Sequence, residues 1–288
     1  MSYSNYEQVV VVDGHELLGV QAVDGNYSIS EKPIKVAGAG MVDAVVDSPL
    51  QGNFNITRKM VCADPFLEKN ILGKYEYDEK EFSGAILYDN QTKGFSFTRA
   101  RLASYSVSCS VGDVPEIKTN FIVYGNLGKA DVIERATKPK ASVKYPDQSS
   151  IKVKISDFNI DAVSDFSFSR SINLNPIYAI PKGEVGELKN DNLEPVQIDT
   201  QYPIETDINV SIVVDSYEIR QIQDRLSSAP KSDVLIEIRD SLDGSIINEY
   251  RGYNVRLVSE AINSSIEEEM SISLTFKGYE SFHNQFYI

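Results

Sequence analysis

FSFTRARLASYSVSCSV, residues 95–111, alternates two kinds of side chain along most of its length. Successive side chains of a β-strand point to opposite faces, so one face holds apolar residues such as Tyr105 and Val107, and the other holds a row of serines. At about 3.3 Å per residue, a straight strand of this length would exceed roughly 50 Å. We therefore predict a half-buried strand that bends near residues 99–101.

The same period of two dominates the rest of the chain. Near the C-terminus, Met270, Ile272, Leu274 and Phe276 alternate with Ser271, Ser273 and Thr275. Shorter alternating runs include residues 151–155 and 166–168. This period is typical of strands with one buried face, so the chain is predicted to be mainly β.

The two halves of the chain carry similar features in the same order, about 140 to 155 residues apart. The matched features are Ala22-Val23 with Ala162-Val163, Pro33-Ile34 with Pro176-Ile177, the strand of Phe54, Ile56 and Met60 with that of Ile208, Val210, Ile212 and Val214, an aspartate that opens a helix at Asp64 and Asp215, the turns at residues 89–94 and 240–244, Arg101-Leu102 with Arg256-Leu257, and the strands at residues 117–125 and 270–278. Few of these residues are identical, but their common order indicates an internal duplication.

One helix is expected in each half. Asp64 precedes a proline, which suits the first position of a helix over residues 65–72. Asp215 can cap a longer helix over residues 216–228, whose apolar residues recur at helical spacing. The predicted fold is thus two tandem β-sandwich or barrel domains, each flanked by one α-helix.

Three segments break the regular pattern. Residues 35–53 and 179–207 are rich in glycine and proline and are expected to be long irregular loops, which are often functional. Residues 127–149 contain several lysines and prolines and are expected to link the domains. The domain boundaries are therefore placed at residues 1–126 and 150–288.

Charge and composition narrow the possible functions. The net charge is −14, from 42 acidic and 28 basic residues, which argues against binding nucleic acid by neutralising phosphates. No apolar run approaches the roughly 20 residues of a membrane helix, and no signal peptide is expected. The two cysteines, Cys62 and Cys109, are interpreted as free thiols of a protein made in a reducing cytosol.

No pattern indicates catalysis, a cofactor or a metal site. The two histidines, His15 and His283, lack a recognisable Ser-His-Asp arrangement. Gly38-Ala39-Gly40 lacks the third glycine of a dinucleotide loop, so a loop without a cofactor is favoured. The acidic residues near positions 76–81 and 267–269 lack calcium-loop spacing and are interpreted as solvated charges.

The order of elements resembles that of the tail tube proteins of tailed bacteriophages, which are related to the tubes of type VI secretion systems and contractile bacteriocins. The resemblance rests on the strand pair at residues 19–29, the loop at 35–53, the helix after Asp64 and the strands at 103–111 and 117–125, and on their counterparts at 160–172, 179–207, after Asp215, 255–262 and 270–278.

This resemblance implies β domains that assemble edge to edge into rings, which stack into a hollow tube. Most family members carry one such domain and form hexameric rings. A chain with two domains is instead expected to pair with itself in rings of three with pseudo-six-fold symmetry. The implied location is the virion tail, after synthesis in the host cytoplasm. A tail sheath, a tape measure and baseplate proteins are implied partners, and genomic DNA passes through the lumen without specific binding.

Two groups of residues follow as candidates for functional contacts. Candidates for contacts between rings lie in the two long loops and are Gly38, Gly40, Met41, Val42, Val45, Val46, Pro181, Gly183 and Gly186. Candidates for the lumen wall are Ser104, Ser106, Ser108, Ser110, Ser271, Ser273 and Thr275. The lumen face is expected to be polar and net negative, with Glu116 and residues 267–269 at a rim.

Other interpretations remain open at this point. Fused tube domains also occur in the family's baseplate hub proteins, so a hub or a tube initiator is one alternative. A β-rich receptor-binding or adhesin module is an alternative of another class, although the chain has no tryptophan. A hydrolytic enzyme is a further alternative.

Overall fold

The computed structural model describes residues 8–28, 31–35, 42–47, 51–66, 80–88, 93–129, 142–146, 150–156, 158–160, 162–178, 194–213, 231–263 and 270–280. Within these ranges the regular elements are β-strands and there is no α-helix. The predicted mainly-β class is therefore confirmed. The predicted helix at 216–228, and that at 65–72 beyond Phe66, lie outside the described residues.

The strands divide into two sets along the chain. The first set is β1 (Val9–Val12), β2 (His15–Leu17), β3 (Val20–Ser28), β4 (Glu31–Lys35), β5 (Val42–Asp47), β6 (Gln51–Lys59), β7 (Phe82–Tyr88), β8 (Lys93–Ser110), β9 (Glu116–Val123) and β10 (Leu127–Lys129). The second is β11 (Ile151–Ile155), β12 (Phe158–Ile160), β13 (Val163–Ile177), β14 (Gln197–Val213), β15 (Ser232–Arg239), β16 (Ile246–Asn263) and β17 (Ser271–Glu280).

Both sets pair their strands in the same order. The first half runs β2-β1-β7-β8-β9-β6-β3, and the second runs β12-β11-β15-β16-β17-β14-β13, with every pair antiparallel. Each of these seven strands of the first half thus has a counterpart in the second. β4 and β5 lie between β3 and β6 along the chain, and β10 has no counterpart among the described strands. The internal duplication read from the sequence is therefore present in the topology.

The irregularities of the two halves also coincide. The β8–β9 pair shifts register between Leu102 and Ser104, and the β16–β17 pair shifts between Leu257 and Ser259, 155 residues later. Near the start of each half, Gly19 and Ala162 both have positive φ, 74° and 56°, at an offset of 143 residues. Two domains with the same strand order need not have bulges and turns at equivalent positions. Their coincidence here indicates that the two halves share the same backbone conformation in detail.

This register tests the residue matches proposed from sequence. The match of Arg101-Leu102 with Arg256-Leu257 is confirmed by the bulges. The match of Ala22-Val23 with Ala162-Val163 is wrong by three residues, because the backbone equates Gly19 with Ala162. The last strands are likewise shifted by two, so that Phe121 corresponds to Phe276. Alternating sequences look alike after such shifts, which hides the true register.

Each half is a sandwich in which one long strand belongs to both layers. Residues 93–100 of β8 pair with β7, and residues 100–108 pair with β9. The same change of partner takes β16 from β15 to β17. Apolar side chains between the layers, among them Phe54, Phe97 and Phe121 in the first half, are fully buried. The predicted bend near residues 99–101 is thus confirmed as the corner between two layers.

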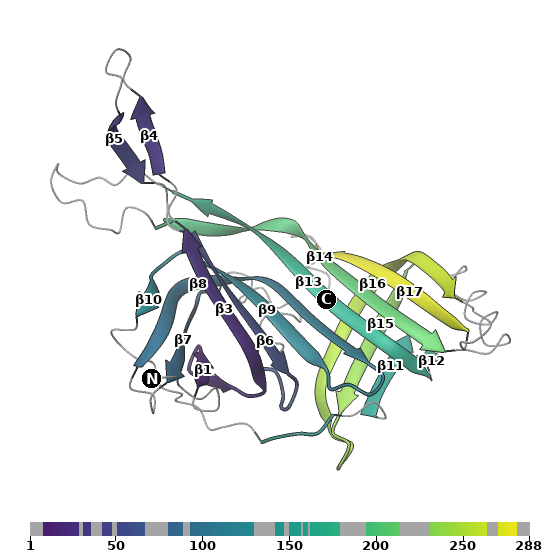
Figure 1. The fold of residues 1–288 in the computed structure, drawn as a ribbon. Coiled ribbons are helices and arrows are strands. Elements are labelled where there is room, and N and C mark those ends of the chain that lie inside the picture. The colour runs from purple at the N-terminus through teal and green to yellow at the C-terminus, as the bar shows by residue number, and fades with distance from the viewer. Residues whose placement is uncertain are drawn as a thin grey trace.

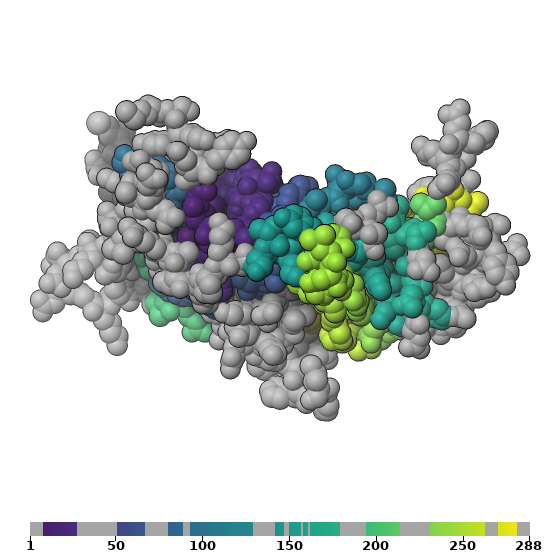
Figure 2. Space-filling view, turned by 90° about the horizontal axis from the view of Figure 1, so that it is seen from below, coloured from purple at the N-terminus to yellow at the C-terminus, as the bar shows by residue number. Residues whose placement is uncertain are grey.

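The two halves share one sheet. Residues 104–110 of β8 pair antiparallel with residues 165–171 of β13, from Ser104 opposite Ser171 to Ser110 opposite Asp165. A single run of eight strands results, in the order β3-β6-β9-β8-β13-β14-β17-β16 (Figure 1). The view from below shows residues of both halves meeting in the middle of the body (Figure 2). We call the β8–β13 contact the internal joint.

Three expectations about irregular segments need correction. The stretch at 35–53 contains β5, which pairs with β4, and the start of β6. The stretch at 179–207 ends in β14, which begins at Gln197. The linker at 127–149 begins with β10, which pairs with β8. Pro203, within the second stretch, lies at a register shift where no residue of β13 is paired with it, a position that proline tolerates in a strand.

Candidate functional site

The side of the eight-stranded sheet that faces away from the core is polar. Four rows of cross-strand neighbours cross it: Asp24-Asn55-Asn120-Ser104-Ser171-Glu205-Tyr279, Ala22-Thr57-Lys118-Ser106-Ser169-Asp207-Lys277-Arg256, Lys59-Glu116-Ser108-Ser167-Asn209-Thr275-Ser259, and Ser110-Asp165-Ser211-Ser273-Ala261. We call this surface the polar face. It runs without interruption across the internal joint.

The polar face unites the serines singled out from sequence. Ser104, Ser106, Ser108 and Ser110 lie on β8, while Ser271, Ser273 and Thr275 lie on the same side of β17. Serines of β13 face those of β8 directly, and side-chain hydrogen bonds join Ser211 to Ser273 (3.0 Å) and Asn209 to Ser167 (3.0 Å). The alternation that predicted a hydroxyl-rich face is therefore correct.

The charges on the polar face are nearly balanced. Its four rows hold five carboxylates and four basic groups. Lys118 and Lys59 contact Glu116 at 3.2 Å and 3.3 Å, and their hydrogen bonds lower the pKa of Glu116 below its ordinary value. Lys277 contacts Asp207 at 3.2 Å, which raises the pKa of the lysine. The excess of negative charge expected for this face is thus only one, and residues 267–269 lie outside the described residues.

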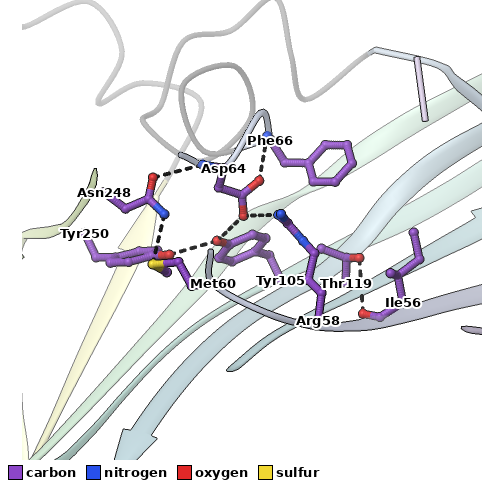
Figure 3. Close-up of polar contacts among 9 residues, drawn as sticks. All are labelled: Ile56, Arg58, Met60, Asp64, Phe66, Tyr105, Thr119, Asn248 and Tyr250. Carbon is purple, nitrogen blue, oxygen red and sulfur yellow. Dashed lines mark hydrogen bonds and ion pairs between the residues drawn. The ribbon is translucent and has the colours of Figure 1, made fainter. Parts of the chain in front are cut away.

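Behind the polar face, a buried polar network connects the two halves (Figure 3). Asp64 is 2% exposed, and its Oδ2 lies 2.5 Å from Nη2 of Arg58 and accepts a hydrogen bond of 2.6 Å from Tyr105. The Tyr105 hydroxyl lies 3.0 Å from that of Tyr250 in the second half. Asn248, also of the second half, accepts a hydrogen bond of 3.0 Å from the backbone N–H of Asp64.

Burial governs the protonation of this network. Burial alone would lower the pKa of Arg58, but the Asp64 carboxylate and Tyr105 outweigh it and the pKa is raised. Burial, with Asp64 next, raises the pKa of Tyr105 well above its ordinary value and raises that of Tyr250. Arg58 is therefore charged and both hydroxyls are protonated at neutral pH. Within the first half, the Asp64 carboxylate makes charge-assisted contacts with Arg58 and Tyr105. The bonds that join the halves, Tyr105 to Tyr250 and the backbone N–H of Asp64 to Asn248, are between neutral groups.

Sequence reasoning missed this network. The sequence predicts Asp64 at a helix start, and its Oδ1 does accept a hydrogen bond from the N–H of Phe66 (2.8 Å). The overlooked signal is Arg58, which follows Phe54 and Ile56 on the inward face of β6. The second half has Ile212 at the corresponding position. A charged residue in a row of core residues indicates a buried partner.

The candidates for contacts between rings are only partly described. Val42, Val45 and Val46 lie on β5, so they belong to a β-hairpin and not to an irregular loop. Gly38, Gly40, Met41, Pro181, Gly183 and Gly186 lie outside the described residues. The β4–β5 hairpin stands away from the body of the molecule in Figure 1.

A cleft of about 980 Å³ opens beside the internal joint. The β8–β9 turn, the β11–β12 hairpin, the start of β13 and the end of β15 line it. Cys109 lines it too, but burial and the nearby Asp113 raise the pKa of its thiol to about 11. A thiol of this pKa is a poor nucleophile at neutral pH, so the cleft offers no activated cysteine.

Other chemical groups are sparse in the part of the chain that the structure describes. There, no three His, Cys, Asp or Glu side chains gather closely enough to hold a metal ion. His15 lies on β2, and both Cys62 and Cys109 are buried free thiols. In the same ranges, no helix has the length and apolar character needed to cross a membrane.

Comparisons with known proteins add no relative. No protein-family model matches the chain, and no curated protein matches its sequence.

Proposed function

We propose that this chain is a structural protein of a bacteriophage tail, in which three copies form a ring and rings stack into a tube that conducts DNA. The observation that carries the proposal is the eight-stranded sheet. Its order is two equivalent blocks of four strands, β3-β6-β9-β8 and β13-β14-β17-β16, joined edge to edge. A block that already pairs with its own duplicate inside one chain is suited to continue around a closed ring.

The size of such a ring suits the passage of DNA. Three copies of the eight-stranded sheet contribute 24 strands. Strands about 4.8 Å apart and tilted by about 40° then close at a backbone radius of roughly 25 Å. After side chains are allowed for, that radius leaves room for a DNA duplex along the axis.

The layers favour the polar face as the inner wall. The other face of the sheet packs on the core and is covered by the second layers, which contain β1, β7 and β8 in the first half and β11, β15 and β16 in the second. If those layers pointed inward, they would fill the lumen. With the layers outside, the wall consists mainly of serines, threonines, asparagines and charged side chains, among which the three lysines are paired with carboxylates.

Such a wall is suited to let DNA slide. Binding to the phosphate backbone needs unpaired basic groups, and three of the four basic groups in the rows of the polar face, the lysines at positions 59, 118 and 277, lie against carboxylates. The proposed role is therefore passive: the protein forms a smooth channel in the virion, without a catalytic step or a cofactor. The acidic balance of the whole chain adds a weak long-range repulsion of DNA.

The β4–β5 hairpin is proposed to contact the next ring. It forms its own two-stranded sheet, and Figure 1 shows it projecting from the body near the far ends of β13 and β14. A hairpin that projects from the body offers edge backbone groups to a neighbour without disturbing the ring beneath it.

Electron microscopy of the purified protein tests this function. The wild-type chain should form hollow rings and short tubes. A variant in which residues 33–45 are replaced by Asn-Gly shortens the hairpin while keeping the paired residues Lys32 and Val46 next to the new turn. That variant should form single rings that do not stack. Compact monomers of the wild-type chain at all concentrations would contradict the proposal.

A further inference from the structure

Two strand edges remain open at opposite ends of the eight-stranded sheet. In the described part of the chain, β3 pairs only with β6, although its counterpart β13 pairs on both sides. The strand ladder of β16 at residues 256–259 and 261–263 is with β17 there, although the counterpart segment of β8 also forms a ladder with β13. In Figure 1, β3 lies in the left half of the molecule and β16 in the right half.

The internal joint shows how these two kinds of edge fit together. It joins β8 to β13, which correspond to β16 and β3. The bulges set the offset between β8 and β16 at 155 residues, and the shared turns set that between β3 and β13 at 143. The joint pairs Ser106 with Ser169, and these positions correspond to Ala261 and Asn26.

We propose that β3 of one copy pairs antiparallel with residues 259–263 of β16 in the next copy, in the register of the internal joint. Asp24 then lies opposite Asn263, Gly25 opposite Ile262, and Asn26 opposite Ala261. The inference rests on the part of the proposed function in which copies of this chain assemble, and it names the strands and the register that join them.

Exposed apolar side chains support this contact. Ile262 is 51% exposed, whereas Val107 at the corresponding position of the internal joint is fully buried. Tyr27 on β3 is 55% exposed, whereas its counterpart Arg170 is 1% exposed. The open edges thus carry large side chains where the internal joint buries them. Pairing with a second copy would bury them and satisfy the edge backbone groups.

Each copy contributes β3 to one contact and β16 to another, so two different edges meet and the contact is head to tail. Such contacts close into a ring when the rotation between copies allows it. Each block of four strands would then meet the next through the same kind of joint, whether within a chain or between chains. Because each chain contributes two equivalent blocks, the order of the ring's pseudo-symmetry would be twice the number of its chains.

Disulfide trapping in the full-length protein tests the register. Asn26→Cys with Ala261→Cys should form a disulfide between copies when an assembled sample is oxidised with copper phenanthroline, because directly opposite residues meet the geometric requirement. Non-reducing electrophoresis should show a ladder that ends at the number of chains in the ring. Asn26→Cys with Ser259→Cys is the register control, since it shifts one partner by two residues on the same face, and it should remain monomeric.

A second pair reports on the geometry itself. Ser106→Cys with Ser169→Cys spans the internal joint and should form an intramolecular disulfide. On non-reducing electrophoresis this variant should still migrate as a monomer. The native Cys62 and Cys109 are buried, and single-cysteine variants measure any contribution from them. The inference is overturned if the Ser106/Ser169 pair closes while the Asn26/Ala261 pair stays monomeric, or if the Ser259 control crosslinks equally well.

The outcomes separate this inference from the proposed function. Hollow rings without the Asn26–Ala261 crosslink would retain the proposed function and reject the register. A crosslinked ladder in assemblies that are not hollow would support the register and reject the DNA-conducting tube. A chain that neither assembles nor crosslinks would reject both.

Discussion

Arg99 and Asn254, 155 residues apart, adopt the same left-handed backbone conformation, with φ of 49° and 51°. Each lies at the corner where a long strand leaves one layer of its sandwich for the other. The surroundings differ, because Arg99 bonds to Glu194 and to the carbonyl of Pro195, whereas the backbone N–H of Asn254 bonds to Asp233. The corner is thus a property of the duplicated backbone and is held by different side chains in each half.

The corner at Asn254 predicts an unusual response to substitution. Asn254→Gly should leave the free energy of unfolding unchanged or raise it by up to about 1 kcal/mol, because glycine adopts positive φ without steric cost. Asn254→Val should lower it by roughly 1–2 kcal/mol, since a β-branched residue clashes in this conformation. Tyr253→Val, at an adjacent exposed position, is the control and should have little effect. Urea unfolding measures the free energy of unfolding of all three variants. Equal free energies for the Gly and Val variants would show that the positive φ at position 254 imposes no strain on a side chain.

The buried ion pair predicts an asymmetric effect of mutations. Asp64→Ala leaves the Arg58 guanidinium buried without its carboxylate and should cost about 3–5 kcal/mol of folding stability. The double variant Arg58→Ile with Asp64→Ala removes both charges and places isoleucine where the second half has Ile212. It should be more stable than Asp64→Ala alone. If urea unfolding shows the double variant to be the less stable of the two, the pair is not a coupled charge site.

The tyrosines of the network predict a loss of stability in alkali. Burial and Asp64 raise the pKa of Tyr105 in the folded state well above 10.0, so folding favours its protonated form. Its contribution is fully present below the unfolded-state pKa near 10 and is lost as the pH rises above it. Cys109, with a folded-state pKa of about 11, adds a loss that begins near pH 9. Tyr105→Phe should therefore flatten the decline of the urea midpoint above pH 10, while the exposed Tyr27→Phe should not. Parallel curves for wild type and Tyr105→Phe would contradict this.

The polar face predicts how the channel treats DNA. Ser106→Lys with Ser108→Lys adds unpaired positive charges to the proposed wall, so assembled rings should retain duplex DNA and release it as the salt concentration rises. Virions carrying both lysines should eject DNA more slowly. Ser241→Lys with Leu242→Lys places the same charges on an exposed turn and is the matched control. Equal retention by both variants, with normal ejection, would place the polar face outside the channel.

Much of the fold could be predicted because period-two alternation survives in most strands. The row Ser104 to Ser110 and the row Ser271 to Thr275 identified two strands of the polar face and its chemistry. The duplication was visible in features such as Arg101-Leu102 and Arg256-Leu257. Its register was wrong elsewhere, because shifts of a few residues along alternating sequences leave similar patterns.

The errors have physical causes in tertiary structure. Gly and Pro near β5 and β14 suggested loops, but pairing with β4 and β13 overrides local preference. The internal joint could not be predicted, since the sequence of an edge strand rarely identifies the strand of another domain with which it pairs. The Arg58–Asp64–Tyr105–Tyr250 network joins positions up to 192 residues apart, which no local pattern can connect.

The number of chains in one ring tests the central claim most directly. Native mass spectrometry of assembled single rings, made with the shortened β4–β5 hairpin, should give the mass of three chains. That result would match six equivalent blocks, two from each chain, around one closed sheet. Six chains per ring would contradict it, because only one block of each chain could then line the channel.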